Sequence, residues 1–367
     1  MPNTSPLSLV GISEPNNSVA MKKPLIEAQS QKSISRRNLL KYGGLMLGGM
    51  SLATLFVNIF KSTSDKAKFK IELIKSIQID SAAEIWSLAI SDDDKFIASG
   101  NKTSNKTGTI EFLNRQTGDI PKILGAQEKV TRALIFTPQT NKLISGDGNG
   151  NIQIWNPQKS NLERQLQGHS KSIWSLAISP DGQTLVSCSE DESVRVWNLA
   201  TGEANRIIFS HDTVVYALAF SPNGKVFASA GKDKIIKIWD AKTRNLLKSL
   251  QGHQDAIRAI AISPDSRYLV SGSWDKTVKV WQLGSGELVT TFEGHTNRVV
   301  TVAISNDSET VFSGSTDNTI KVWSIKNNRL ITTLSEHRGW VLALATSQQE
   351  NLLFSGGKDG TIKLWEY

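Results

Sequence analysis

The sequence predicts an all-β repeat protein that follows a polar tail and one apolar helix. Three observations predict this organisation: tryptophans recur every 42 residues, histidines keep the same spacing, and each repeat holds short alternating apolar runs between turn residues. Phe112 lies 43 residues before the first periodic tryptophan in a matching context, so we count seven repeats. The periodic tryptophans are Trp155, Trp197, Trp239, Trp281, Trp323 and Trp365.

The formal net charge of +8 belongs almost entirely to the first part of the 367-residue chain. Residues 1–70 contain 10 Lys/Arg and 3 Asp/Glu, a balance of +7, whereas residues 71–367 contain 32 and 31, a balance of +1. The nearly neutral body argues against nucleic-acid binding. Residues 1–34 are polar and have no hydrophobic period, so we expect a disordered tail there.

Residues 35–60 combine a basic motif with an apolar run. The string Ser-Arg-Arg-x-Leu-Leu-Lys precedes 19 uncharged residues, 42–60, which at about 1.5 Å per residue just span a hydrocarbon core of roughly 30 Å. With Arg36 and Arg37, the motif resembles the twin-arginine export signal, although Leu39 stands where the usual pattern has Phe. The resemblance implies export of a folded body across a membrane. A buried helix of a soluble domain is the alternative.

The processing and orientation of this segment are separate questions. No A-x-A-like cleavage site follows residue 60, which favours a retained membrane anchor over a cleaved leader. The twin-arginine resemblance implies a membrane-anchored, extracytoplasmic body, in the periplasm or an equivalent lumen. The alternative is a body on the cytoplasmic face of the membrane. Residues 61–69 are expected to be a short tether.

The third repeat shows the strand pattern most clearly. Apolar or alternating runs at 173–178, 184–189 and 193–197 indicate three strands, and a fourth begins at Ile207. Ser-Pro-Asp-Gly at 179–182 is a turn sequence, because proline presets φ and Asp-Gly tolerates the rest of the turn. Four short strands per repeat indicate an all-β repeat architecture.

Residues 71–367 resemble the WD40 family of β-propellers. The resemblance is carried by the period, by Gly-His pairs and by one Trp-Asp pair, at 168–169, 252–253, 294–295 and 239–240. It implies one four-stranded blade per repeat around a central channel, and hence a seven-bladed WD40 β-propeller over residues 70–367. The seventh repeat lacks a fourth strand, and residues 70–79 have strand composition, so we expect them to close the ring and remove an exposed edge.

Each of five repeats has one His, one Ser, one Asp and one Trp at matching places. The resemblance implies that these side chains form buried hydrogen-bonded tetrads, in which Trp donates, Asp accepts, and Ser and His bridge them. A hydrolase triad is the other interpretation, but five copies at a fixed period argue against one catalytic site. The tetrads are His169, Ser187, Asp191, Trp197; His211, Ser229, Asp233, Trp239; His253, Ser271, Asp275, Trp281; His295, Ser313, Asp317, Trp323; and His337, Ser355, Asp359, Trp365.

Four tryptophans lie outside the period, and the resemblance places them on one face near the channel mouth, the top face. Trp86 and Trp174 share one slot, to which we assign Thr131 in the second repeat. Trp, Tyr and Arg are enriched at binding hot spots, so we expect a partner to bind here; local packing between blades is the alternative. The expected binding residues are Trp86, Trp174, Tyr216, Arg258, Trp274, Arg298, Trp340, Lys232 and Lys358.

These patterns favour a non-catalytic interaction scaffold, tethered to or exported across a membrane through residues 42–60. Every histidine has a structural slot, the single Cys188 lies in a strand, and the sequence has no phosphate-binding glycine motif or metal-ligand cluster. We therefore expect no catalytic residue, no metal and no cofactor. The expected partner is a protein or peptide on the top face of a monomeric propeller. The alternative is an extracytoplasmic enzyme or small-ligand binder that uses the central channel.

Overall fold

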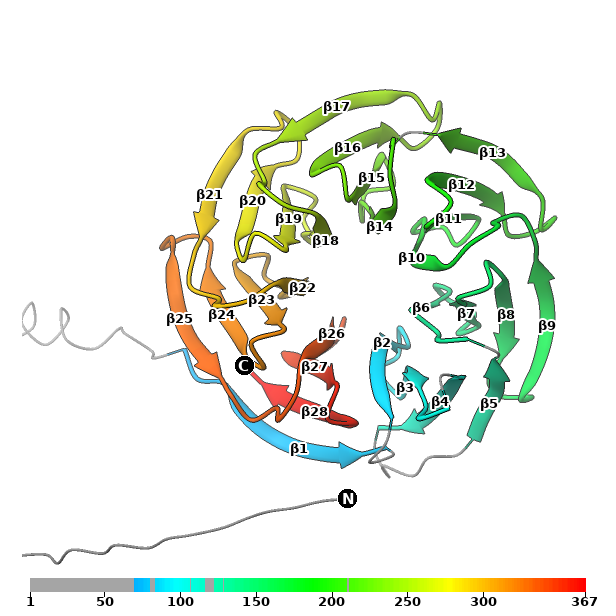
Figure 1. Ribbon diagram of the computed structural model, residues 1–367, viewed down its shortest axis with the longest axis horizontal. Helices are drawn as coiled ribbons and strands as arrows, with labels where there is room; N and C mark the ends of the chain where they lie inside the picture. Colours follow the sequence, from blue (N-terminus) through cyan, green and yellow to red (C-terminus); the bar gives the residue numbers. More distant parts are fainter. Residues whose placement is uncertain (1–68, 80–82, 106, 116–121, 128, 210) are drawn as a thin grey trace, which may run out of the picture. The chain divides into compact units, whose positions relative to one another are not determined.

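The structure is a computed structural model that describes residues 69–79, 83–105, 107–115, 122–127, 129–209 and 211–367. The expected tail (1–34), the export signal and anchor (35–60) and most of the tether lie outside the described residues. Seven four-stranded antiparallel sheets form blades around a central channel (Figure 1). The prediction of an all-β, seven-bladed propeller is confirmed. Within the described ranges, no helix has the length and apolar character needed to cross a membrane.

Each blade has four strands, ordered from the channel to the rim. The inner strands are β2 (Glu84–Ile90), β6 (Ala133–Phe136), β10 (Ile173–Ile178), β14 (Val215–Phe220), β18 (Ile257–Ile262), β22 (Val299–Ile304) and β26 (Val341–Thr346). The second strands are β3 (Phe96–Lys102), β7 (Leu143–Gly146), β11 (Thr184–Ser189), β15 (Val226–Gly231), β19 (Tyr268–Ser273), β23 (Thr310–Ser315) and β27 (Leu352–Gly357).

The third and outer strands complete the blades. The third strands are β4 (Gly108–Asn114), β8 (Ile152–Asn156), β12 (Ser193–Asn198), β16 (Ile235–Asp240), β20 (Val278–Gln282), β24 (Ile320–Ser324) and β28 (Thr361–Glu366). The outer strands are β5 (Lys122–Gln127), β9 (Asn161–Leu166), β13 (Ala204–Phe209), β17 (Leu246–Gln251), β21 (Leu288–Phe292), β25 (Arg329–Leu334) and β1 (Glu72–Gln78).

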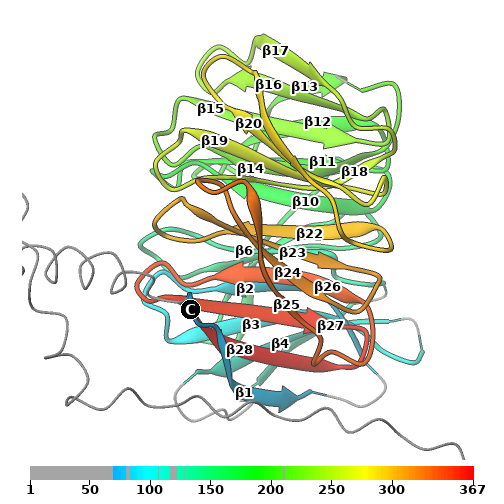
Figure 2. The same ribbon diagram turned by 90° about the vertical axis from the view of Figure 1, so that its left-hand side faces the viewer.

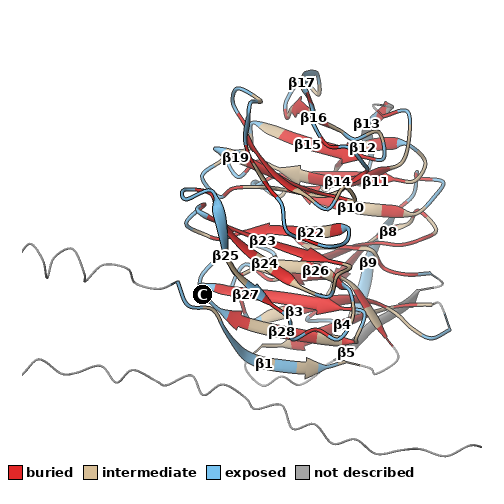
Figure 3. Ribbon diagram, turned by 60° about the vertical axis from the view of Figure 1, so that its left-hand side comes forward, coloured by how far each residue is buried: buried red, intermediate tan, exposed pale blue. Residues whose placement is uncertain are grey.

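Burial falls from the second strands to the rim (Figure 3). Every residue of β23 and β27 is buried, whereas β9 and β17 are mostly exposed. A strand that is covered on both faces reads as a continuous run of apolar and small residues, without alternation. The second strands therefore supply most of the core, and the outer strands contribute mainly backbone pairing.

The expectation that the fourth strand of the third repeat begins at Ile207 is wrong. β13 begins at Ala204, which pairs with Trp197 of β12, and Arg206 pairs with Val196. An outer strand pairs its backbone with only one neighbouring strand and buries few side chains. Its residues can therefore be polar, and its sequence need not show an apolar pattern. The apolar run that suggested Ile207 therefore marks only the second half of the strand.

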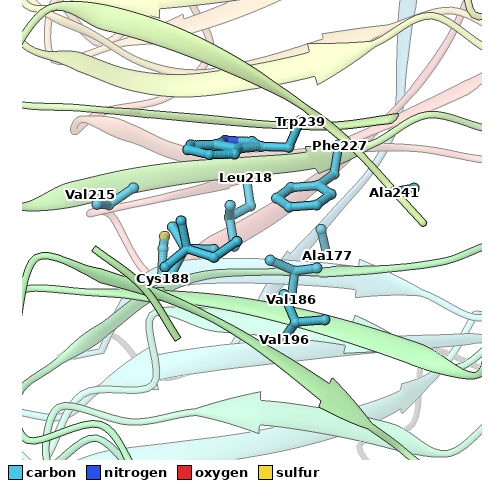
Figure 4. Packing of buried hydrophobic residues seen from close by; sticks show 11 residues of the cluster. Ala177, Val186, Cys188, Val196, Val215, Leu218, Phe227, Trp239 and Ala241 are labelled. Atoms are coloured by element: carbon cyan, nitrogen blue, oxygen red, sulfur yellow. The ribbon is translucent and has the colours of Figure 1, made fainter. Parts of the chain in front are cut away.

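Seven apolar clusters fill the spaces between neighbouring blades. Figure 4 shows the cluster between the third and fourth blades, where Cys188 of one blade packs with Phe227 and Trp239 of the next. Another cluster joins Ile85 of the first blade to Phe354 of the last. Every interface, including the one between the last and first blades, is therefore an apolar core that stabilises the ring.

The ring is closed by β1, which is the outer strand of the last blade. β1 runs antiparallel to β28, with Glu72 opposite Glu366 and Gln78 opposite Thr361. Figure 1 shows the blue β1 along the red β28, and Figure 2 shows the same pair from the side. β28 is thus paired on both edges, with β27 and β1.

The two faces of the propeller carry different connections. The top face carries the turns between second and third strands and the links from each outer strand to the next inner strand; the bottom face carries the other turns. Thr361 begins β28 at the top, so the antiparallel β1 begins at the bottom. There the ring of Phe69 stacks on Tyr367, with centroids 6.4 Å apart. The chain therefore enters the propeller at its bottom edge.

Candidate protein-interaction face

A β-bulge in six of the inner strands aims one side chain at the channel mouth. In β10 the pairing register shifts across Trp174, and the other five inner strands shift at the equivalent residue. A bulge leaves one residue unpaired and redirects its side chain, which explains how the repeat presents a variable residue here. The bulged residues, all of which line the channel cavity, are Trp86, Trp174, Tyr216, Arg258, Val300 and Leu342.

Arg132 holds this position in the second blade, and the assignment of Thr131 to it is wrong. Thr131 is fully buried, whereas Arg132 lies just before β6 with its guanidinium over two indole rings. Its Cζ atom is 5.3 Å from the ring centroid of Trp86 and 4.5 Å from that of Trp174. The period itself points to Arg132, since 42 residues separate it from Trp174.

The stacking continues around the channel mouth. Arg258 lies 4.7 Å from the ring centroid of Trp174 and 5.8 Å from that of Tyr216. The Tyr216 ring is 5.1 Å from Trp174 and 5.7 Å from Trp274, and Arg298 lies 4.5 Å from the Trp274 ring. These contacts make a continuous row of aromatic and guanidinium groups, each contact being favourable. We name the row the aromatic–arginine cluster: Trp86, Arg132, Trp174, Tyr216, Arg258, Trp274, Arg298, Trp340 and Lys358.

Trp340 and Lys358 belong to the last blade and meet the first. Lys358 Nζ is 4.5 Å from the Trp340 ring centroid and 3.6 Å from a carboxylate oxygen of Glu84. Glu84 also accepts hydrogen bonds of 3.0 Å from Trp86 Nε1 and Lys102 Nζ. Burial opposes ionisation of Glu84, but these hydrogen bonds and the two lysine charges lower its pKa. The Glu84 carboxylate is thus neutralised by its own neighbours.

A cavity of about 440 Å³ opens among the cluster residues on the top face. Trp340 is 42% exposed and Arg298 is exposed, so the cavity opens outward between them. Its lining is aromatic and cationic, with Asn297 and Thr316 as the further polar side chains. The lining residues are Trp86, Trp174, Arg258, Trp274, Asn297, Arg298, Val300, Thr316, Trp340 and Leu342.

The structure brings together all the expected binding residues except Lys232. Lys232 lies exposed in the turn between β15 and β16, where its backbone N–H donates to Val214 O at 2.9 Å. Among the described side chains, it forms neither an ion pair nor a ring contact with the cluster. Lys232 shares the top face, but it belongs to a different part of it.

Five tetrads fix the turns beneath this face. In the third blade, Trp197 Nε1 donates to Ser187 Oγ at 2.8 Å; Ser187 Oγ lies 2.7 Å from His169 Nε2, and His169 Nδ1 lies 2.9 Å from Asp191 Oδ2. Because Trp only donates and an ionised Asp only accepts, Ser Oγ–H donates to Nε2 and Nδ1–H donates to Asp. A neutral histidine therefore satisfies every group. Equivalent bonds form around His211, His253, His295 and His337.

The tetrad carboxylates also hold the turn backbone. Asp191 accepts hydrogen bonds from the backbone N–H of Ser170 at 3.0 Å and of Ser193 at 3.1 Å. Burial opposes its ionisation, but hydrogen bonds from His169 and Ser193 lower the pKa of Asp191 well below its usual range. In other blades the equivalent aspartate directly follows Trp274 or Lys358. The tetrads thus anchor the turns that present cluster residues.

Cysteine and histidine side chains, which often carry catalysis, have structural roles in this propeller. In the part of the chain that the structure describes, no group of three or more His, Cys, Asp or Glu residues is placed to hold a metal ion. Cys188 lies fully buried in β11, and burial raises the pKa of its thiol, so it is a neutral core residue. All five histidines are buried in tetrads.

The blades and their tetrads define a WD-repeat β-propeller, a class whose members generally serve as protein-interaction scaffolds and are typically non-catalytic. The family model described as the TEP-1 second beta-propeller matches residues 132–331, which are 200 of the 367 residues, and the model described as the WD domain, G-beta repeat, matches residues 328–366. The chain belongs to this WD40 β-propeller family. No curated protein matches the chain.

Proposed function

We propose that this protein is a non-catalytic scaffold that binds a segment of a partner protein on its top face. The aromatic–arginine cluster carries the proposal, because it gathers four tryptophans at the mouth of one cavity. Trp and Arg anchors near the centre of a desolvated patch supply most of the affinity in protein interfaces. Stacking between the rings also keeps the anchors ordered before binding, which lowers the entropy lost on association.

The enzyme or small-ligand alternative for the central channel has less support. Converging acidic or polar groups would favour it. The channel cavity has no acidic residue in its described walls, and its polar side chains Ser87, Ser175 and Thr301 lie among apolar, aromatic and cationic ones. The histidines are already bonded at both ring nitrogens within the tetrads. A segment of a protein suits the open cavity between Trp274 and Trp340 better than an enclosed small molecule does.

Panning a random twelve-residue peptide display library against the full-length protein, purified in a neutral detergent, tests this proposal. We expect enriched peptides whose affinity falls at least about tenfold for Trp274→Ala/Trp340→Ala, since each hot-spot truncation costs roughly 2 kcal/mol or more. Leu247→Ala, at an exposed apolar residue of the rim, is the matched control and should bind normally. Equal binding to the double variant would contradict a top-face site; circular dichroism checks that each variant is folded.

We propose further that the scaffold is monomeric and is held at a membrane by residues 42–60, on the extracytoplasmic side. The uncharged run and the Arg36-Arg37 motif support this location. Protease treatment of spheroplasts should digest the propeller from outside while the anchor stays in the membrane fraction. Arg36→Lys/Arg37→Lys should block export. Protection that is lost only on lysis would place the propeller on the cytoplasmic face instead.

A further inference from the structure

Two arginines of the channel mouth occupy the ring faces that could otherwise bind a cation from a ligand. Arg132 stacks on Trp86 and Trp174, and Arg258 stacks on the same Trp174 and on Tyr216. Aromatic cages of this kind bind cationic ligands when their ring faces are free. Here the faces are covered by fixed positive charges, which repel a lysine or arginine of a partner.

These arginines also lack a counterion within the described residues. Neither Arg132 nor Arg258 forms an ion pair with a described residue. Both line the channel cavity and Arg258 also lines the outer cavity, and neither cavity has an Asp or Glu in its walls. Glu84 is already paired with Lys102 and Lys358. Glu190 is close enough to favour the charge of Arg132, but it lies beyond ion-pair distance. Half-buried positive charge without a carboxylate is costly, and an incoming anion would offset that cost.

Two donors of the same site are buried without a partner. Arg132 Nε and Trp174 Nε1 have no hydrogen-bond acceptor among the described groups, although buried donors are nearly always paired. Both side chains line the channel cavity beside Arg258. Burial and the charge of Arg132 lower the pKa of Arg258 to about 10, so Arg258 stays protonated at neutral pH. The mouth is therefore cationic and rich in free donors.

We propose that the channel mouth accepts the carboxylate of an Asp or Glu from the bound segment, with Arg258 and Arg132 as its ion-pair partners. The guanidinium groups of Arg132 and Arg258 lie over the Trp174 ring, and a planar guanidinium has N–H groups that match the two oxygens of a carboxylate. An apolar residue next to that acid then fills the cavity between Trp274 and Trp340. The inference rests on the proposed function, and it adds the chemistry of the partner.

Charge complementarity favours an acidic segment of a partner protein over two other occupants, the chain's own residues 1–70 and a phosphorylated segment. The chain's own residues 1–70 carry a balance of +7, which is the wrong sign for a segment that would fold back onto the arginines. A phosphoryl group has three acceptor oxygens, whereas the outer cavity adds only Asn297 and Thr316 to its arginines and indoles. A carboxylate followed by an apolar side chain fits both the charge and the aromatic lining.

The same peptide display library gives the test. Peptides enriched on the full-length protein should contain Asp or Glu beside an apolar residue. In fluorescence anisotropy, a Glu→Gln or Asp→Asn peptide should bind at least about tenfold more weakly. Arg258→Gln should weaken the acidic peptide equally and remove its advantage over the amide peptide, as a coupled pair requires. Arg267→Gln, which alters an exposed arginine paired with Asp265 near the bottom face, is the control and should change neither affinity.

The possible outcomes distinguish a failure of this inference from a failure of the proposed scaffold function on which it rests. If the enriched peptides lack Asp and Glu but bind Trp274→Ala/Trp340→Ala more weakly, the top-face site would be upheld and the proposal of a bound carboxylate would be overturned. Tighter binding of a phosphoserine peptide would overturn it as well, in favour of a phosphate site. Peptides that bind the double tryptophan variant normally, or a library that yields no peptide, would overturn both proposals. The amide-peptide comparison uses the wild-type protein, so it remains decisive even if Arg258→Gln does not fold.

Discussion

Residues of the repeat divide into those that support the turns and those that differ at the channel mouth. The tetrad residues are the same in five blades, and each polar group in them is paired. The bulged position instead changes from Trp174 to Tyr216 to Arg258 in successive blades. Two of the buried donors that have no partner among the described groups, Arg132 Nε and Trp174 Nε1, lie at this second kind of position. The residues that support the turns are thus different from the bulged residues that we propose for recognition, which lie in the inner strands.

Ser271 should couple the two halves of its tetrad. Its hydroxyl accepts from Trp281 Nε1 at 2.9 Å and lies 2.7 Å from His253 Nε2. Ser271→Ala leaves both buried nitrogens unpaired, at about 1–3 kcal/mol of unfolding free energy each. In a chemical-denaturation cycle with Trp281→Phe, the double variant should lose less than the sum of the single losses. Additive losses would mean that the bonds act independently.

The tetrads should make the propeller sensitive to acid. Burial opposes ionisation of Asp275, but hydrogen bonds from His253 and Thr277 lower its pKa well below the usual range. A folded-state pKa below the unfolded value of about 3.9 stabilises the fold above that pH, and the contribution is lost progressively as the pH falls towards the folded value. The Tm should therefore fall steeply between pH 5 and pH 2. Asp275→Asn should lower the Tm at pH 7 and reduce the acid-induced drop; an unchanged drop would contradict this origin.

Most of the candidate site could be predicted because the period aligns the blades. Counting by 42 identified Trp174, Tyr216 and Arg258 as equivalents, and it also leads to Arg132 when it is applied strictly. The order in which the rings and guanidinium groups of the cluster stack could not be predicted. The 42-residue period gives the position of a residue in its repeat, but it does not give the direction of its side chain. The separation of Lys232 from the cluster, and the pairing of Glu84 with Lys358, likewise depend on contacts between blades.

Among the elements, β1 is a poorly covered strand with a large structural role. Its residues are mostly exposed, and Ile74 is 51% exposed, yet it supplies the outer edge of the last blade. Lys363 Nζ donates to Ser76 Oγ at 3.1 Å, and the backbone N–H of Ile79 donates to Gly360 O at 3.0 Å. Backbone pairing therefore holds the first and last segments of the propeller together, with support from the partly buried side chains of Ile71, Ile77 and Ile79.

Deleting residues 72–78 should leave β28 with an open edge, which is a template for pairing with another chain. We expect dimers or larger species in size-exclusion chromatography with light scattering, together with a lower Tm. A chain that lacks only residues 2–34 keeps β1 and serves as the control, so it should behave like the full-length protein. A β1 deletion that stayed monomeric and unfolded at the same temperature would contradict this role.

Element boundaries were predictable where both faces of a strand are buried. The second and third strands follow apolar patterns, such as 184–189, that only a buried strand explains. The outer strands lack this constraint, so the true start of β13 at Ala204 has no apolar signature. The bulges of the inner strands were also invisible in sequence, because a bulge is defined by pairing between two strands.

The whole propeller has a defined polarity relative to the point where its described chain begins, at Phe69. β1 begins at the bottom edge, and the stacked rings of Phe69 and Tyr367 lie there too. Residues 61–69 span at most about 30 Å when fully extended. We therefore predict that the membrane anchor proposed above, joined through so short a segment, holds the bottom face near the membrane and presents the aromatic–arginine cluster to the surrounding compartment.

Reporter cysteines on one blade can test this orientation. Lys232 is exposed at the top of the fourth blade and Lys242 is exposed at its bottom, and the native Cys188 is buried, so background labelling should be low. In membranes, a 5-kDa maleimide-polyethylene glycol should modify Lys232→Cys several-fold faster than Lys242→Cys, because the lipid surface obstructs a bulky reagent at the bottom face. Detergent should equalise the two rates, which controls for intrinsic reactivity. Faster modification at Lys242→Cys in membranes would mean that the cluster faces the lipid, and a top-face partner would then have to compete with the membrane.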